Sequence, residues 1–326
     1  MNKVFLSTIH KYFPAAKIKN TSRVFPHTEI IHFSQKGSKF VAKLIEHQVL
    51  STYSLQKRRR AIRSLYKTTN AYYHLLKKEG IPVPPHHELV IEKNQLIEFA
   101  TDLGNKRLDA ILQKASIKER QNLTTKYITE ILPILGQEKY HVGFDASAEN
   151  FFWFKGRFTF CDFVPARMKY QGAYLVGFPQ PTKRKEIQKG YERYYLPYGI
   201  LRRARIFFLS IHPQLDQIFF SALQKKLSKS AFQRLQNQFQ ASDEFIVKKY
   251  IKLKQWPRAL KTIESISDTD TLREIAILVF WLIKEQTIPT EVYDLSRLHT
   301  HFSQRQKEKR FTTFKKSITN IITSIL

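Results

Sequence analysis

The sequence predicts an α+β fold, in which a small antiparallel sheet and one long helix precede a larger, mostly helical part. Three observations lead to this prediction. Within residues 1–100, two pairs of strand-like segments flank one helix-like segment. An aromatic hairpin is indicated at residues 151–161, where two apolar runs meet at a Lys-Gly turn. From residue 201 onward, the spacing of apolar residues is mostly helical.

The first strand pair is predicted at residues 29–33 and 39–45, because both segments carry β-branched and aromatic residues and a turn-like segment joins them. Side chains alternate across a strand, so Lys43 shares one face of the second strand with Val41 and Ile45. A lysine in this position commonly extends its ammonium to solvent along an apolar stem. The residues by themselves therefore favour a solvent-facing Lys43.

A long helix is predicted over residues 51–79, because an apolar stripe recurs at helical spacing and Gly80 is a suitable C-cap. Residues 57–78 of this helix include eight basic residues and no acidic one. Helices usually mix both signs of charge on an exposed face, because like charges one turn apart repel each other. Two interpretations remain open: the face is a solvated basic surface, or it binds an anionic ligand.

A second strand pair is predicted at residues 88–91 and 95–99, joined by a hairpin turn. Beyond this pair the pattern becomes helical, with helices predicted at about 106–115 and 117–135. We therefore predict two domains. Residues 1–100 form an N-terminal domain of sheet and helix, and residues 101–326 form a helical C-terminal domain that contains the aromatic hairpin.

Polar residues bracket the aromatic hairpin. Asn150 directly precedes its first strand, Asp162 follows its second strand, and Asp145 lies five residues before Asn150. Antiparallel pairing brings the open ends of a hairpin together, so we expect Asn150 and Asp162 to be near neighbours, with backbones roughly 5 Å apart if the two residues are directly paired. A carboxylate and an amide oxygen at one point can hold Mg2+, and a second carboxylate nearby can act as a base. The alternative role of such residues is to cap the loop with hydrogen bonds.

Composition limits the class of protein. The chain has 326 residues, of which 42% are hydrophobic and 13% aromatic, and this indicates a folded globular protein. With one cysteine and no apolar run long enough to span a membrane, we expect a cytoplasmic protein without a cleaved signal peptide. The net charge of +28 favours an anionic partner, such as a nucleotide, a nucleic acid, an anionic lipid or a charged glycan.

The order of these features resembles the protein-kinase-like fold with its two lobes. A strand lysine, Lys43, is followed by a long helix that ends in Gly-Ile-Pro-Val-Pro, and a strand pair then ends in Ile-Glu-Phe. Asp145 and Asn150 form an Asp-x4-Asn pattern, and Asp162 follows twelve residues after Asn150. Over about residues 20–170 the chain is similar to the aminoglycoside-phosphotransferase and choline-kinase branch and to the lipopolysaccharide-core sugar kinases. It also resembles, more loosely, uncharacterised kinase-like bacterial proteins.

The resemblance implies that the N-terminal domain binds ATP. Lys43 would hold the α- and β-phosphates of the nucleotide. Arg23, or backbone amides next to it, would take the place of a glycine-rich phosphate loop. Glu98, Phe99 and Ala100 would form the hinge whose backbone meets the adenine.

The resemblance also implies the reacting groups. Asp145 would accept the proton of the attacking hydroxyl, and Asn150 and Asp162 would bind Mg2+. The expected function is therefore an ATP- and Mg2+-dependent phosphotransferase for a hydroxyl of a small-molecule, glycan or lipid-linked acceptor. The basic composition favours an anionic acceptor and a peripheral contact with the anionic inner face of a membrane.

Two departures from the family pattern support an alternative. Residues 51–78 offer Lys43 no acidic partner, since Asn70 or Ala71 stands at the expected position, and no glycine lies between residues 20 and 32. These departures favour a nucleotide-binding scaffold with little or no catalytic activity. A nucleic-acid-binding protein is a third reading of the high positive charge, but the sequence has no established nucleic-acid motif.

Overall fold

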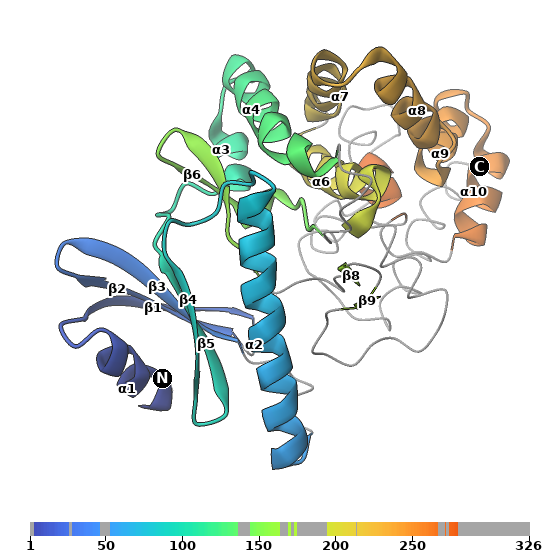
Figure 1. Cartoon of the computed structure of the whole chain (residues 1–326). Helices are drawn as coiled ribbons and strands as arrows, with labels where there is room; N and C mark the ends of the chain where they lie inside the picture. Colours follow the sequence, from blue (N-terminus) through green and yellow to red (C-terminus); the bar gives the residue numbers. More distant parts are fainter. Residues whose placement is uncertain are drawn as a thin grey trace, which may run out of the picture. The chain divides into compact units, whose positions relative to one another are not determined.

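The computed structural model describes residues 3–25, 28–45, 53–135, 144–163, 169–170, 173–174, 194–212, 214–266, 271 and 274–279. The chain divides into two compact units, Met1–Ala204 and Arg205–Leu326. The first unit contains a five-stranded antiparallel sheet and a long helix, and the described part of the second is helical (Figure 1). The predicted α+β class is therefore confirmed. The domain boundary expected after residue 100 falls at the end of a strand inside the first unit and stays a prediction.

The sheet has the strand order β1-β2-β3-β5-β4, and every neighbouring pair is antiparallel. Its strands are β1 (Lys17–Phe25), β2 (Thr28–Gln35), β3 (Ser38–Ile45), β4 (His87–Glu92) and β5 (Gln95–Thr101). The four strands predicted from the sequence correspond to β2 through β5. The sequence did not indicate β1, because its residues are mostly polar and lack a clear alternation of apolar side chains.

Three hairpins of the first unit, β2–β3, β4–β5 and β6–β7, are closed by two-residue turns that the structure describes. In each turn both residues have positive φ, which is the requirement of a type I′ turn. The aromatic hairpin follows this rule with φ of 47° at Lys155 and 86° at Gly156. Gly156 meets this requirement without strain, because it has no Cβ. The other two turns are Lys36-Gly37 and Lys93-Asn94.

A short N-terminal helix, α1 (Lys3–Tyr12), covers one face of the sheet. Phe5 of this helix belongs to one buried cluster with Phe33 of β2 and Phe99 of β5. The sequence analysis did not predict α1. It is only ten residues long, so its stability must come from packing on the sheet.

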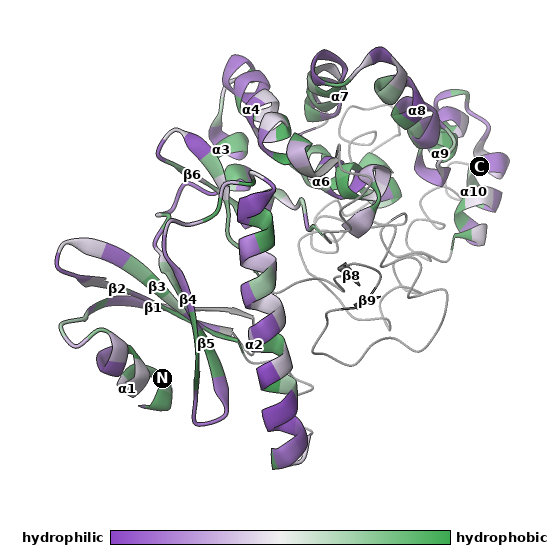
Figure 2. Cartoon of the chain, in the orientation of Figure 1, coloured by the Kyte–Doolittle hydropathy of each residue, from purple (hydrophilic) through white to green (hydrophobic). Residues whose placement is uncertain are grey.

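The long predicted helix is confirmed as α2 (Leu55–Lys78), which packs on the other face of the sheet. Ile62 of α2 shares a buried cluster with Leu96 of β5. The Ser54 side chain caps the first turn by accepting from the Lys57 amide, and Gly80 follows the helix with φ of 79°. Figure 2 shows hydrophilic residues concentrated over the N-terminal half of α2.

The rest of the first unit contains the predicted helices and the aromatic hairpin. The two helices are α3 (Leu108–Lys114) and α4 (Ile117–Leu135), close to the predicted ranges. A 3-10 turn, η2 (Ala148–Asn150), leads into the hairpin strands β6 (Phe151–Phe154) and β7 (Arg157–Phe160). A separate two-stranded pair consists of β8 (Lys169–Tyr170) and β9 (Ala173–Tyr174).

Further helices make up the described remainder of the chain. They are α6 (Pro197–Ile211), α7 (Gln214–Lys226), α8 (Lys229–Gln240), α9 (Asp243–Lys252) and α10 (Trp256–Ser265). Among the residues that the structure describes, no helix is both long enough and apolar enough to cross a membrane. Residues 305–316, a segment with several Lys and Arg and one acidic residue, Glu308, lie outside the described residues.

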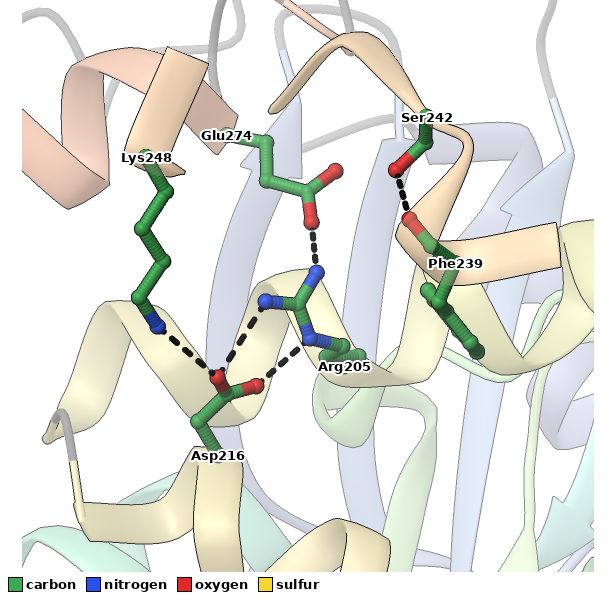
Figure 3. Close-up of polar contacts among 6 residues, drawn as sticks. All are labelled: Arg205, Asp216, Phe239, Ser242, Lys248 and Glu274. Carbon is green, nitrogen blue, oxygen red and sulfur yellow. Dashed lines mark hydrogen bonds and ion pairs between the residues drawn. The ribbon is translucent and has the colours of Figure 1, made fainter. Parts of the chain in front are cut away.

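A buried cluster of charges lies in the core of the second unit (Figure 3). Arg205 donates two hydrogen bonds to the carboxylate of Asp216 and one to Glu274. Lys248 also approaches Asp216, at 3.7 Å. Burial alone would lower the pKa of Arg205, but the carboxylates of Glu274 and Asp216 outweigh this effect and raise it. Three aromatic rings surround the guanidinium of this arginine: Phe220, Phe239 and Phe245.

Candidate active site

Asp145 lies in the loop that leads into the aromatic hairpin. Its Oδ1 accepts hydrogen bonds from the Ser147 amide, at 3.1 Å, and from Ser147 Oγ. Nε of Arg203 on α6 donates to the same oxygen, at 3.4 Å. The Tyr127 hydroxyl on α4 donates to the carbonyl of Ala146. These contacts fix the position of Asp145, and its side chain remains 16% exposed, so the carboxylate is accessible to a ligand.

The open end of the hairpin brings Asn150 close to Asp162. The Cys161 amide donates to the Asn150 carbonyl at 3.0 Å, so the predicted proximity of the two hairpin ends is confirmed. Nδ2 of Asn150 donates to the carbonyl of Asp145 at 3.3 Å. This hydrogen bond fixes the orientation of the Asn150 side-chain amide, with its nitrogen turned toward Asp145. The three predicted polar residues therefore meet in one region of the first unit.

Aromatic packing and backbone hydrogen bonds hold the hairpin in place. The Phe160 amide donates to the carbonyl of Pro82 at 2.8 Å, which connects β7 to the Gly-Ile-Pro segment after α2. The Trp153 amide donates to the carbonyl of Lys106, also at 2.8 Å. Buried rings fill the space under the hairpin: Tyr127, Phe144, Phe151, Phe160 and Phe163. The aromatic residues thus serve as the support for the polar groups at the open end.

Lys43 reaches the same region from β3. Its Nζ lies 3.7 Å from Oδ1 of Asp162, and its side chain is 25% exposed. Burial alone would lower the pKa of Lys43, but the charges of Asp162 and Glu98 outweigh burial and raise that pKa above its usual value. Lys43 is therefore a cation at neutral pH. The solvent-facing lysine favoured by the residues alone is not what the structure shows.

Glu98 lies directly opposite Lys43 in the pairing of β3 with β5. Its side chain is buried, and Nε2 of His87 lies 3.4 Å from its Oε1. Burial alone would raise the pKa of Glu98, but the contact with His87 and the charge of Lys43 hold that pKa below its usual value. Glu98 is therefore a buried carboxylate between two nitrogen-bearing side chains.

The predicted hinge residues lie inside a strand. Glu98, Phe99 and Ala100 belong to β5, which continues to Thr101. Phe99 points into the sheet core on the α1 side, and Ala100 pairs with Val41 and His87 of the neighbouring strands. The side chains of Glu98 and Phe99 are thus both buried, on opposite faces of the sheet. Their role in meeting an adenine stays a prediction.

Arg23 lies in β1, where its backbone pairs with Glu29 of β2. The position of its side chain is outside the described part of the structure. A phosphate-binding role for Arg23 therefore stays a prediction. The strands β1 and β2 do lie at one edge of the sheet, next to β3, which carries Lys43.

The donor groups at the hairpin end suit a metal ion that is shared with a ligand. Asp162 offers a carboxylate whose side chain is 36% exposed, and Asn150 offers an amide oxygen. Within the described residues, no group of three or more His, Cys, Asp or Glu side chains could form a complete metal cage. Mg2+ commonly binds through one or two protein oxygens together with substrate phosphates and water. The set of Asp162 and Asn150 fits that mode of binding.

Cys161, the one cysteine of the sequence, lies between Phe160 and the candidate metal ligand Asp162. Burial, followed by the negative charge of Asp162, raises the pKa of the Cys161 thiol from 9.0 to about 12. The thiol is therefore neutral at physiological pH. A neutral thiol is a poor nucleophile and a poor ligand for Mg2+, so Cys161 contributes packing rather than chemistry.

Sequence reasoning missed several residues of this site. Arg203 and Ser147 hold Asp145, and His87 contacts Glu98. Tyr72 of α2 also belongs to this region. Burial and the charges of Asp162 and Asp145 raise the pKa of its hydroxyl well above the usual value. A signal for Arg203 was present in the sequence: it stands within a helix rich in apolar residues, and a buried arginine requires an acidic partner.

Comparison with solved structures gives similarity to kinases. No protein-family model and no curated protein matches the chain. The kinase PK-1 of the Cydia pomonella granulovirus is 10% identical with a TM-score of 0.40, and the match covers 84% of this chain and 90% of that chain. The PknI kinase domain of Mycobacterium tuberculosis, as a double mutant, is 11% identical with a TM-score of 0.38, covering 68% of this chain and 90% of that chain. Values this low carry no information about activity, so function has to be argued from the side chains.

Proposed function

We propose that the chain is an ATP- and Mg2+-dependent phosphotransferase that acts on a hydroxyl of a small-molecule, glycan or lipid-linked acceptor. The observation that carries this proposal is the 3.7 Å approach of Lys43 on the sheet to Asp162 at the hairpin. Phosphoryl transfer requires a cation for phosphate oxygens, oxygen ligands for a metal ion, and a base for the hydroxyl. Lys43, Asp162 with Asn150, and Asp145 supply these three requirements.

Each of these residues has a distinct role in the proposed reaction. Asp145 accepts the proton of the attacking hydroxyl, while Ser147 and Arg203 keep its carboxylate in one orientation. Lys43 binds phosphate oxygens of the nucleotide through its ammonium. Asp162 and Asn150 would hold Mg2+, which neutralises charge on the phosphates when it is bound. The catalytic contribution of the chain is then mainly positioning and charge neutralisation.

The acceptor is proposed to be anionic. The chain carries a net charge of +28, and α2 contains eight basic residues without an acidic one. Such a surface raises the local concentration of anions by electrostatic attraction, and this effect weakens as salt concentration rises. A phosphorylated sugar or a lipid headgroup fits this description, and contact with an anionic membrane surface would follow from the same charges.

A second candidate function is a nucleotide-binding scaffold without turnover. The specific observations in its favour are the absence of an acidic residue from α2 and the absence of glycine between residues 20 and 32. Each of these two absences would weaken the binding of the nucleotide phosphates, and neither would remove the metal site. The two functions share nucleotide binding and differ only in phosphoryl transfer.

Nucleotide binding is tested by thermal unfolding of the full chain with and without Mg·ATP. We expect the nucleotide to raise the midpoint of unfolding for the unmodified chain, because a ligand that binds only the folded state stabilises it. Asp162→Asn should remove most of this shift, since it takes one negative charge from the metal site. Asp243→Asn, the same change on α9 of the second unit, is the matched control and should retain the shift.

Turnover is tested by release or transfer of the γ-phosphate with a panel of anionic hydroxyl acceptors. Asp145→Ala should abolish turnover while keeping the Mg·ATP shift, because Asp145 acts on the acceptor and not on the nucleotide. Binding without turnover for every acceptor would favour the scaffold. An unmodified chain that shows neither binding nor turnover would overturn both candidate functions.

A further inference from the structure

Any phosphate-binding lysine on a strand needs a fixed counter-charge, because an ammonium on a flexible stem has many positions available. The helix that packs over Lys43, α2 (Leu55–Lys78), contains no Asp or Glu. Its nearest contribution to the region is the buried Tyr72, whose hydroxyl is neutral because burial raises its pKa. The helix therefore offers Lys43 no negative charge.

The sheet itself supplies a carboxylate at this point. Glu98 of β5 is the direct partner of Lys43 in the antiparallel register, and side chains of directly paired residues project from the same face of a sheet. That face is the one covered by α2, because Ile45 and Leu96, two residues away on each strand, both pack in the α2 cluster. Glu98 and Lys43 therefore lie side by side beneath α2.

We infer that Glu98 is the positioning residue for Lys43, so that the lysine is held by a strand carboxylate instead of a helix carboxylate. This inference rests on the proposed function, in which Lys43 binds phosphate, and it concerns how that lysine is positioned. Lys43 then lies between two carboxylates. Glu98 is its directly paired neighbour in the sheet, and Asp162 faces it from the hairpin at 3.7 Å.

His87 completes the arrangement on the other side of Glu98. Its imidazole is fully buried and stacks on the ring of Tyr73, with centroids 4.3 Å apart and an interplanar angle of 17°. The ring of Phe163 meets the imidazole edge-on at 4.7 Å. These contacts fix the imidazole with its Nε2 at 3.4 Å from Oε1 of Glu98. A buried carboxylate requires such partners, since burial without them would favour the protonated form.

A strand carboxylate differs from a helix carboxylate in one physical respect. The distance between directly paired residues is set by the hydrogen-bond ladder of the sheet, so it does not change if a covering helix shifts. The backbone positions of Lys43 and Glu98 are therefore fixed relative to each other whether or not α2 moves. In this chain the counter-charge of the lysine is a constant feature of the fold and is not available as a helix-controlled switch.

The test compares Glu98→Gln, Lys43→Met and the double variant, with Glu88→Gln as matched control. Glu88 lies on β4, and its side chain is 46% exposed. The first readout is affinity for a fluorescent ATP analogue in the presence of Mg2+. Glu98→Gln should weaken affinity roughly tenfold, within the range of coupling between neighbouring residues, and Glu88→Gln should leave it unchanged. In the Lys43→Met background, Glu98→Gln should have no further effect, because it acts through the lysine.

The second readout is thermal unfolding without nucleotide, which does not depend on the proposed function. Lys43→Met leaves Glu98 buried without its counter-charge, so the double variant should unfold at a higher temperature than Lys43→Met alone. If Glu98→Gln fails to fold, Glu98→Asp keeps the charge and should bind the analogue more tightly than Lys43→Met does.

Additive effects on unfolding, or unchanged nucleotide affinity in Glu98→Gln, would overturn the inference and leave the proposed function intact. Absence of binding by the unmodified chain, together with coupled unfolding, would overturn the proposed function alone.

Discussion

At the scale of single residues, Asp145 depends on two neighbours for its orientation. Ser147 donates to its Oδ1 from the next turn of chain, and Arg203 donates to the same oxygen from a distant helix. A base must be aligned with the proton that it accepts, and small misplacements are costly. We predict that Arg203→Gln reduces turnover about 10- to 100-fold, since it removes the charge that faces Asp145.

The measurement for Arg203→Gln is steady-state kinetics combined with nucleotide affinity. Affinity should change by less than about twofold, because Arg203 contacts the base and not the phosphate-binding lysine. Arg157→Gln is the control, since Arg157 forms a comparable ion pair with Glu130 at 2.8 Å on the surface of the hairpin. Equal losses of turnover in both variants would show that the effect is not specific to the base.

Glu98 makes the stability of the first unit depend on pH in the acidic range. Its pKa is held below the usual value of 4.5 by His87 and Lys43, against the opposing effect of burial. Its contribution to the free energy of unfolding is therefore fully present above pH 4.5, and it is lost as pH falls through the lower folded-state pKa. We predict a steeper loss of stability below pH 4.5 for the unmodified chain than for Glu98→Gln, measured by denaturant unfolding. Parallel pH profiles for the two proteins would contradict this prediction.

At the scale of elements, α2 begins in an electrostatically unfavourable way. The positive end of the helix dipole meets basic side chains in the first turns, and no acidic residue lies in the first turn. We predict that Gln56→Glu stabilises the protein by about 0.5–1 kcal/mol, because the new carboxylate faces the dipole and lies four residues before Arg60. The midpoint of thermal unfolding should rise by about 1–4 °C.

The matched control for this helix is Gln56→Lys at the same exposed position. It adds the opposite charge and should lower the midpoint by a similar amount. Both effects should shrink in high salt, because the charges are exposed to solvent and are screened. A rise in stability for both variants would indicate helix propensity, and not the dipole, as the cause.

The elements of the first unit were largely predictable from sequence, and the exceptions have physical reasons. Strands β2 to β5, helix α2 and the aromatic hairpin follow from periodicity and turn residues. β1 and α1 do not, because β1 is mostly polar and α1 is short, and both are stabilised by neighbours that are distant in sequence. Periodicity measures only local preference, so elements that depend on tertiary packing escape it.

The part of the candidate site that lies on one hairpin was predictable from the sequence. The part that depends on contacts between distant segments was less predictable. Asn150 and Asp162 become neighbours through local antiparallel pairing. Lys43 with Glu98 depends on the register of two strands that are separated by a helix and another strand. The resemblance implied a hinge at Glu98, Phe99 and Ala100, and these residues lie inside β5, which continues to Thr101. Their contact with an adenine stays a prediction.

At the scale of the whole molecule, the second unit depends on the charge cluster around Arg205. This arginine pairs with Asp216 and Glu274 in a buried position, surrounded by aromatic rings. Removing one member of a buried cluster leaves uncompensated charges inside the protein. We predict that Arg205→Met destabilises the second unit by about 3–5 kcal/mol, because two carboxylates would remain buried without their main partner.

Hydrogen exchange locates the effect of Arg205→Met within the chain. Amide protection should decrease in α7, α8 and α9 and remain in the sheet, because the two units are separately compact. Arg258→Met is the control, since Arg258 is exposed and donates only to the nearby Gln255 side chain, at 3.1 Å. Equal loss of protection in both units would contradict the expected independence.

Cys161 makes the candidate site observable in solution by thiol alkylation, without an engineered label. It is the one thiol of the chain, it adjoins Asp162, and its pKa is raised from 9.0 to about 12. At pH 8 the folded state should therefore hold far less thiolate than an exposed cysteine would, and alkylation should be slow in the folded state and faster whenever the hairpin opens. The rate of alkylation then reports how often this region opens. If Mg·ATP binds there, it should slow the reaction in proportion to its occupancy, and an unchanged rate would place the nucleotide elsewhere.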